Sequence, residues 1–186
     1  MRCWATWLGV ALAWVGAPAR AQDAPVLLDR VVAVVGDRLV LASDLAVEQA
    51  LCGRDLRAER ALRCEGRDPL DLAIDAAIVR GLAGNVAIYD PAPSEVRARL
   101  DALRAAWVDP KEDEAFLTAC GLDEGSLQGL LYSRIVVERY VHRTVTLASE
   151  AAGESESEAA ARYQAWITTQ RGMVTLRLVA PREAPW

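Results

Sequence analysis

The sequence predicts a mainly α-helical fold, in which a helical bundle carries a small antiparallel sheet formed by an N-terminal hairpin and a C-terminal strand. Two β-prone runs lie on either side of Gly36 and Asp37, a pair that is typical of a hairpin turn. Segments with apolar residues three or four positions apart follow and indicate amphipathic helices. Near the end, residues 173–179 alternate between apolar and polar side chains, as a half-buried strand does.

The composition suits one folded domain behind an export signal. Of the 186 residues, 53% are hydrophobic and 25% are charged, which is typical of a globular chain. Arg2, the uncharged apolar run 4–15 and the small-residue site at residues 19–21 form the pattern of a secretory signal peptide. That run is shorter than the ~20 residues that span a bilayer as a helix. We therefore expect removal of residues 1–21, a single domain at residues 22–186 in the periplasm, and no stable membrane insertion.

The charge of the exported chain disfavours one class of partner. Removing Arg2 and Arg20 from the 21 basic residues leaves 19 basic against 26 acidic side chains, a net charge of −7. Affinity for a phosphate backbone depends mainly on clustered lysine and arginine. We therefore expect no nucleic acid partner.

The opening elements are a hairpin and a helix. Residues 31–35 and 38–41 are the two β-prone runs, and the loop between them places Gly36 first. Glycine tolerates the positive φ that a type II′ turn needs at that position. Ser43 can cap a helix that begins at Asp44, whose charge is favourable at the positive end of the helix dipole.

Asp-Pro pairs mark the starts of the next two helices, because proline at the first helical position lacks an N–H that would have no partner there. The first pair is Asp68 and Pro69, and Gly84 is placed to end that helix. Its apolar stripe is Leu70, Ile74, Ile78 and Leu82. The second pair is Asp90 and Pro91. The stripe that follows it is Val96, Leu100, Leu103 and Trp107.

The second half of the chain contains the helix that we expect at the centre of the bundle. A short helix through Phe116 and Cys120 precedes it, and Asp123 can cap a long helix from Glu124 to about Val145. Its broad apolar face predicts burial on several sides. That face comprises Leu127, Leu130, Leu131, Ile135, Val137 and Val141.

The C-terminal part is expected to begin with a linker. Residues 147–158 are small and acidic, which is typical of a solvated connection. Ser155 and Glu158 can form a capping box for a terminal helix that Gly172 is placed to end. The terminal helix and strand are expected within residues 159–180.

Three cysteines follow the signal segment: Cys52, Cys64 and Cys120. Export implies an oxidising compartment, in which thiols tend to pair. Cys52 and Cys64 flank a short polar stretch, so we favour a bridge between them and expect Cys120 to be a small buried hydrophobe. The only histidine is His142 and no CxxC motif is present. We therefore expect neither a metal site nor a cofactor.

Two segments carry a resemblance to a known family. Residues 29–44 form an alternating hairpin that leads into a Ser-Asp helix start, and Trp166 is followed by Gln170, Arg171 and the alternating strand. Together with the order of elements over about residues 26–180, this resembles the chaperone module of the SurA family, periplasmic chaperones that escort outer-membrane proteins. The resemblance implies that the hairpin and the C-terminal strand meet in one sheet.

The sequence departs from that family at one place. Its members usually carry one or two parvulin-type prolyl isomerase domains between the bundle and the terminal helix. Here only residues 147–158 occupy that place, whereas a minimal domain needs ~50 residues. We therefore expect a chaperone core that is not an enzyme, and prolyl isomerase activity is the less favoured function.

The function that the resemblance implies is binding of unfolded or outer-membrane polypeptides through apolar surface of the helical bundle. Leu103, Trp107 and Leu131 are the candidate client-binding residues, although such side chains more commonly belong to a core. The alternative is a non-catalytic scaffold or dedicated partner of one envelope protein, because the same sequence features would serve it.

Overall fold

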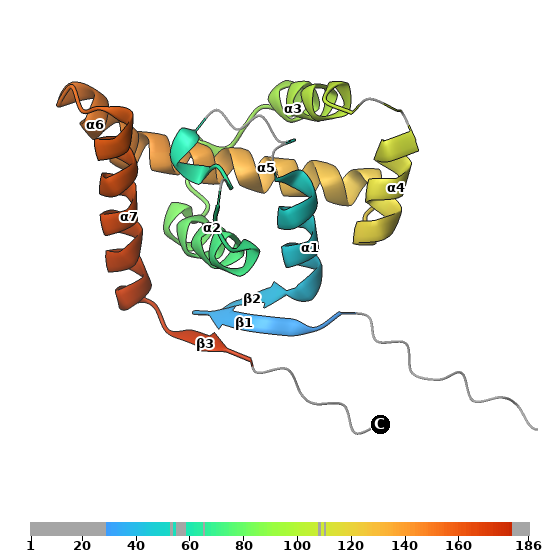
Figure 1. Ribbon diagram of the computed structural model, residues 1–186, viewed down its shortest axis with the longest axis horizontal. Coiled ribbons are helices and arrows are strands. Elements are labelled where there is room, and N and C mark those ends of the chain that lie inside the picture. The colour runs from blue at the N-terminus through green and yellow to red at the C-terminus, as the bar shows by residue number, and fades with distance from the viewer. Residues whose placement is uncertain are drawn as a thin grey trace, which may run out of the picture.

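A three-stranded antiparallel sheet lies against one side of a group of helices (Figure 1). The structure is a computed structural model that describes residues 29–52, 54, 59–64, 66–107, 109 and 111–179. The expected signal peptide and its cleavage site lie outside these residues.

The sheet has the order β2-β1-β3, and both pairings are antiparallel. Its strands are β1 (Val31–Val35), β2 (Arg38–Leu41) and β3 (Leu176–Leu178). Gly36 has a φ of 60°, and Asp37 has no positive φ, so the hairpin turn is of the expected type II′ class. The N-terminal hairpin and the C-terminal strand therefore share one sheet, and the predicted mainly α fold with a small sheet is confirmed.

Helices form most of the remainder of the described part of the chain. The α-helices are α1 (Ala42–Leu51), α2 (Pro69–Ala83), α3 (Pro93–Ala105), α4 (Lys111–Cys120), α5 (Glu124–Val141), α6 (Leu147–Ala151) and α7 (Glu156–Met173). The shorter segments are the 3-10 helices η1 (Arg60–Leu62) and η2 (Ala87–Tyr89) and the π-helix η3 (His142–Thr146).

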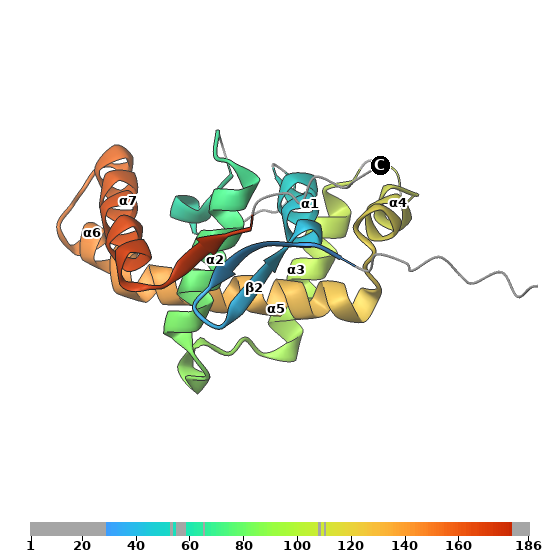
Figure 2. The ribbon, with the colours of Figure 1, turned by 90° about the horizontal axis from the view of Figure 1, so that it is seen from below.

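The α5 helix lies at the centre, as its broad apolar face predicts. Two clusters of buried side chains form the core, and α5 contributes to both of them. Leu127 and Leu131 pack with α1, α3 and α4, whereas Val137 and Val141 pack with α2, α7 and the sheet. Figure 2 shows α5 running across the width of the molecule, where it crosses α2 and α3.

Two helix starts differ from the expectation because carboxylates cap them from inside the first turn. The first helix begins at Ala42, since Asp44 Oδ2 accepts the Leu41 N–H at 2.8 Å. The Ser43 hydroxyl instead donates a hydrogen bond to Asp29, which precedes β1. Similarly, α3 begins at Pro93 rather than after Asp90. There Glu95 accepts from the Ala92 N–H at 2.8 Å, and Asp90 accepts a hydrogen bond from the Tyr132 hydroxyl at 2.5 Å.

The predicted apolar stripe of α2 faces the core except at its last residue, Leu82. Ile74 and Ile78 are buried, but Leu82 is 39% exposed and Ala83 is buried in its place. A spacing of four residues advances 400° around a helix of 3.6 residues per turn. Four residues in such a row therefore drift off the buried face.

The expected linker is mostly helical. Residues 147–151 form α6, which continues from α5 through the π-helical turn, and α7 already begins at Glu156. Only residues 152–155 lie between the two helices. The capping box is present, with Ser155 N–H donating to Glu158 Oε2 at 2.8 Å. At its other end α7 passes through Gly172 and ends at Met173, one residue later than expected.

An ion cluster attaches α7 to α2. Arg171 Nε donates to Asp75 Oδ1 at 2.7 Å, and its Nη1 donates to Asp71 Oδ1 at 2.8 Å. Arg67 binds the other oxygen of Asp75, which is only 1% exposed. Because β3 follows α7 directly, these contacts also determine where the third strand meets the sheet.

Candidate functional site

The three residues predicted to bind clients lie in the core. Leu103 is 1% exposed, Trp107 is 7% exposed and Leu131 is 0% exposed, and all three belong to the cluster between α1, α3, α4 and α5. Trp107 packs on Phe116 with 5.6 Å between ring centroids. These side chains therefore hold helices together and are almost inaccessible to solvent, which corrects the expectation that they bind clients.

Accessible apolar side chains gather instead around the C-terminal strand. Their exposed fractions are 72% at Met173, 37% at Leu176, 61% at Leu178 and 41% at Val179. We refer to these four residues as the apolar edge. The alternation at residues 173–179 predicts a half-buried strand, but all three residues of β3 are exposed.

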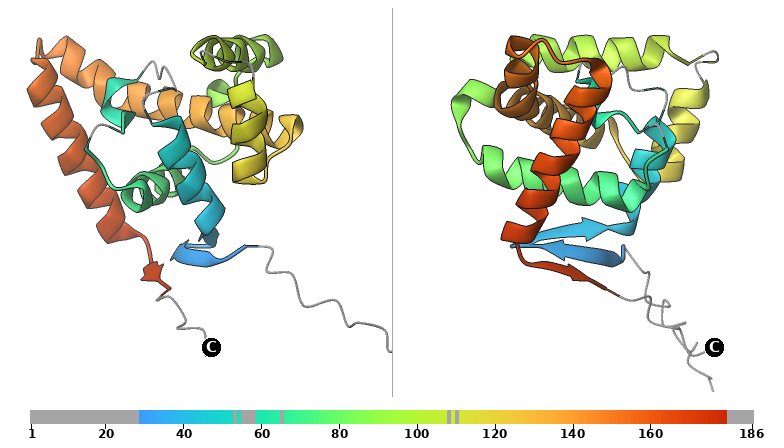
Figure 3. Two further views of the ribbon diagram at one scale, coloured as in Figure 1. Left: turned by 45° about the vertical axis from the view of Figure 1, so that its right-hand side comes forward. Right: turned by 60° about the vertical axis from the view of Figure 1, so that its left-hand side comes forward.

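The position of β3 in the sheet explains this exposure. Leu176 lies opposite Val35 and Leu178 lies opposite Ala33, so both leucines are on the helix-facing side of the sheet. However, α2 packs on β1 and β2, and α1 packs on β2. Figure 3 shows β3 as the outermost strand, next to β1 and beyond the part of the sheet that these helices cover.

The backbone of β3 has one side that the sheet does not use. Gly36 N–H donates to Thr175 O at 2.8 Å, and Val179 N–H donates to Val32 O at 2.9 Å. Hydrogen-bonded pairs alternate along an antiparallel ladder, so Arg177 also directs its backbone groups at β1. The N–H and C=O groups of Leu176 and Leu178 therefore point away from β1, and within the described residues no further strand lies there.

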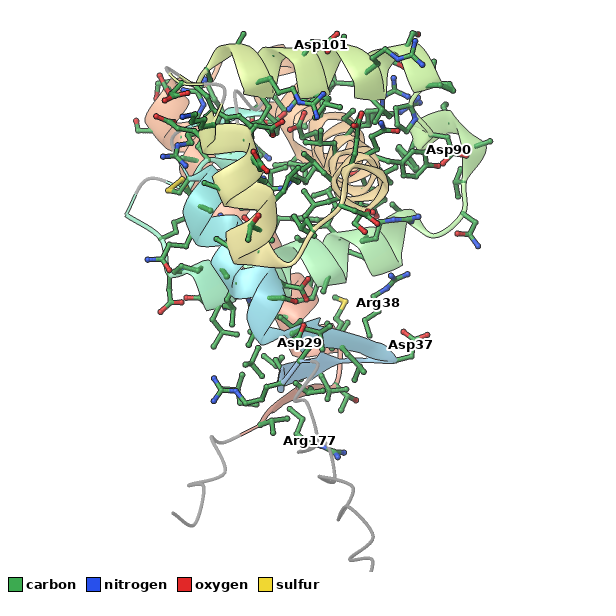
Figure 4. The ribbon with its side chains drawn as sticks, turned by 90° about the vertical axis from the view of Figure 1, so that its right-hand side faces the viewer. Asp29, Asp37, Arg38, Asp90, Asp101 and Arg177 are labelled. Atoms are coloured by element: carbon green, nitrogen blue, oxygen red, sulfur yellow. A yellow bond between two sulfur atoms is a disulfide. The ribbon has the colours of Figure 1, made fainter. Side chains whose placement is uncertain are left out.

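A positive charge lies in the middle of this strand. Arg177 is exposed and is opposite Val34, which puts it on the side of the sheet that faces away from the helices (Figure 4). Among the residues that the structure describes, no ion pair to Arg177 is found. Strand β3 therefore combines two exposed leucines on the helix-facing side, unused backbone groups in the plane of the sheet and a cation on the other side.

A first hollow beside α5 is, by contrast, lined by structural contacts. A cavity of about 230 Å³ lies between α1, α2, α5 and β2. Glu48 and Arg134 on its wall pair at 2.6 Å, and Glu138 pairs with Arg99 through two hydrogen bonds of 3.0 and 2.9 Å. Burial raises the pKa of Asp44, which also lines it. These pairs join α1 and α3 to α5, so packing of the helices accounts for them.

An acidic hollow beside the π-helix is the second candidate. It has a volume of about 450 Å³ and lies between η3, α6 and the start of α7. His142 Nδ1 lies 3.5 Å from Glu59 Oε2 there, and the His142 side chain is 47% exposed. In the described part of the chain, no group of three or more histidine, cysteine or acidic residues is arranged to hold a metal ion.

The structure joins Cys52 to Cys64 by a disulfide, with 5.6 Å between their Cα atoms. This is the pairing that the sequence favours. Cys120 is free and 9% exposed, and burial raises the pKa of its thiol. It packs in the core as a small hydrophobe and takes no part in the apolar edge.

Sequence reasoning missed the apolar edge because it treated alternation as evidence of burial. One signal was present: a single strand that joins a hairpin whose two strands already pair must become an edge of the sheet. Its short length and its central arginine are features of edge strands.

No helix among the described residues is long and apolar enough to cross a membrane.

In the comparisons with known proteins, no family model matches this chain, and no curated protein matches it.

Proposed function

We propose that this protein binds unfolded polypeptides in an extended conformation, as a non-catalytic periplasmic chaperone. The observation that carries the proposal is the apolar edge, where exposed leucines lie beside unused backbone groups of β3. Native proteins normally cover such an edge, because an uncovered edge strand is a template for pairing with another chain. A protein that retains one has a surface suited to capture extended segments.

The alternating residue pattern of outer-membrane polypeptides matches this surface. The strands of outer-membrane barrels alternate apolar and polar residues, so an unfolded chain of this class presents one apolar face when it is extended. That face matches the leucines on the helix-facing side of β3. The SurA-like order of elements and the signal-like segment at residues 1–21 support the same client class and the periplasmic location.

The proposed binding is weak and broad. Ordering a flexible client offsets much of the contact free energy, so we expect dissociation constants in the micromolar range or above. Weak binding is useful for a chaperone because the client must leave in order to fold.

The test is suppression of aggregation of a urea-unfolded outer-membrane protein on dilution. We compare the wild-type chain with the variant Leu176→Ser/Leu178→Ser. The matched control is Val86→Ser/Ile88→Ser. It replaces two apolar residues outside the sheet that are 53% and 54% exposed, Val86 just before η2 and Ile88 within it. Circular dichroism and thermal unfolding establish that each variant folds.

We expect the wild type and the η2 control to suppress aggregation and the β3 variant to lose most of that effect. Suppression no greater than that of an inert acidic protein would overturn the chaperone proposal. A pull-down that recovers a single envelope protein in stoichiometric amount, rather than many unfolded chains, would favour the role of a dedicated scaffold. In a proline-peptide assay we expect no acceleration of cis-trans isomerisation, and a rate above background would contradict the non-catalytic part of the proposal.

A further inference from the structure

We propose that the client segment joins the sheet as a fourth, antiparallel strand beside β3, and that an acidic side chain of the segment pairs with Arg177. This inference rests on the proposed function and specifies the pattern that the edge selects. Its first support is the direction of the backbone groups. Leu176 and Leu178 each direct one N–H and one C=O away from β1, so an incoming extended segment can continue the ladder.

The second support is the placement of side chains across the edge. Residues directly opposite one another in paired strands project to the same face of the sheet. Client residues opposite Leu176 and Leu178 would therefore lie on the helix-facing side, next to exposed leucine side chains. Apolar side chains are favoured at both positions because they reduce the exposed apolar area of both partners.

The third support is the charge between these two positions. The client residue opposite Arg177 would project to the outer face, with Cβ atoms about 5 Å apart. Arg177 is exposed on that face and has no ion pair with a described residue. A glutamate or aspartate there gains a cross-strand ion pair, whereas a lysine or arginine is repelled. The selected pattern is thus apolar, acidic, apolar.

The same arginine disfavours a second copy of this chain as the occupant. If two β3 strands paired about a two-fold axis at their central residue, each Arg177 would face the Arg177 of the other copy. Like charges directly opposite one another destabilise a strand pair. A charged residue in an edge strand is a common defence against self-pairing, and it leaves the edge open to a segment of opposite charge.

The experiment uses the full exported chain and capped nine-residue peptides in which threonine and valine alternate. The central residue is glutamate in one peptide and lysine in the other, with valine on both sides of it. Two further glutamate peptides carry backbone N-methyl groups. In one, the two valines beside the glutamate are methylated, and in the control only the glutamate is methylated. Binding is followed by NMR titration, and amide hydrogen exchange is measured for β3.

We expect the glutamate peptide to bind roughly tenfold tighter than the lysine peptide at low salt, with a smaller ratio at high salt. The variant R177E should reverse this preference, and R177Q should remove it. Methylation of the two valines should abolish binding, whereas methylation of the glutamate should not, because its N–H points away from β3 in the proposed pairing. Bound peptide should protect the amides of Leu176 and Leu178, while the amide of Arg177 is already protected by pairing with β1.

The outcomes separate this inference from the proposed function. Suppression of aggregation without protection of the Leu176 and Leu178 amides would overturn strand addition and leave the chaperone proposal standing. Protection of those amides with equal affinity for both peptides would overturn the role of Arg177. Protection that rises with protein concentration in the absence of peptide would identify a second copy as the occupant and overturn the inference. Loss of aggregation suppression itself would overturn the proposed function.

Discussion

Asp75→Asn should destabilise this protein far more than Asp71→Asn, although both aspartates lie on α2 and bind the same arginine of α7. The Asp75 side chain is 2% exposed and receives hydrogen bonds from Arg171 and Arg67. The Asp71 side chain is 51% exposed and receives a hydrogen bond from Arg171. The two substitutions therefore remove one negative charge each from the same cluster at different depths.

The magnitude follows from the solvent exposure of the partners. Removing one member of a buried ion pair costs about 3–5 kcal/mol, because the remaining charge stays buried without compensation. The asparagine amide would keep one acceptor oxygen, and the side chains of Arg67 and Arg171 are 18% and 29% exposed, so we expect the lower limit, ~3 kcal/mol. An exposed pair contributes at most ~1 kcal/mol, which bounds the cost of Asp71→Asn.

The assay is urea and thermal unfolding followed by circular dichroism. For a chain of this size, each kcal/mol shifts the melting temperature by roughly 2–4 °C. We therefore expect a decrease of about 6–12 °C for Asp75→Asn and of at most ~4 °C for Asp71→Asn. Equal costs for the two variants, or a cost below ~1 kcal/mol for Asp75→Asn, would refute the conclusion that this cluster holds α7 and β3 in place.

Four further outcomes are expected. Burial raises the pKa of Tyr163 to about 12, and the unfolded value is ~10, so the folded state keeps a proton that the unfolded state loses between these pH values. Stability should thus fall by about 2–3 kcal/mol as the pH rises from ~10 to ~12, and Tyr163→Phe should remove this fall in urea titrations at stepped pH. The buried Cys120 thiol should react with a thiol reagent far more slowly in the native protein than in urea, and equal rates would place it at the surface. Reduction of the Cys52–Cys64 bridge should cost at most ~3 kcal/mol, and non-reducing peptide mapping that linked Cys120 would contradict this pairing. Mass spectrometry of the envelope fraction should find an N-terminus at Gln22, and an uncleaved chain would contradict export.

The sequence by itself determined the elements whose causes are local. The caps at Asp68, Asp123 and Ser155 are where the sequence predicts them, because each side chain binds a backbone N–H two or three residues ahead. Val96, Leu100 and Leu103 share one face of α3, as their spacing predicts, since the helical period fixes which side chains lie on the same side of a helix. The type II′ turn at Gly36 likewise depends on one residue's tolerance of positive φ.

Only the tertiary structure decided which apolar residues are accessible. Leu103 and Leu178 have the same side chain, yet one is 1% and the other 61% exposed. The spacing of apolar residues in the sequence predicts that two residues share a face of a helix or strand. It does not predict whether a neighbouring element covers that face. Leu178 lies on the helix-facing side of the sheet and remains exposed because β3 extends the sheet past the helices that cover β1 and β2. Coverage depends on contacts between segments about a hundred residues apart, such as Arg171 with Asp71, which local patterns do not encode.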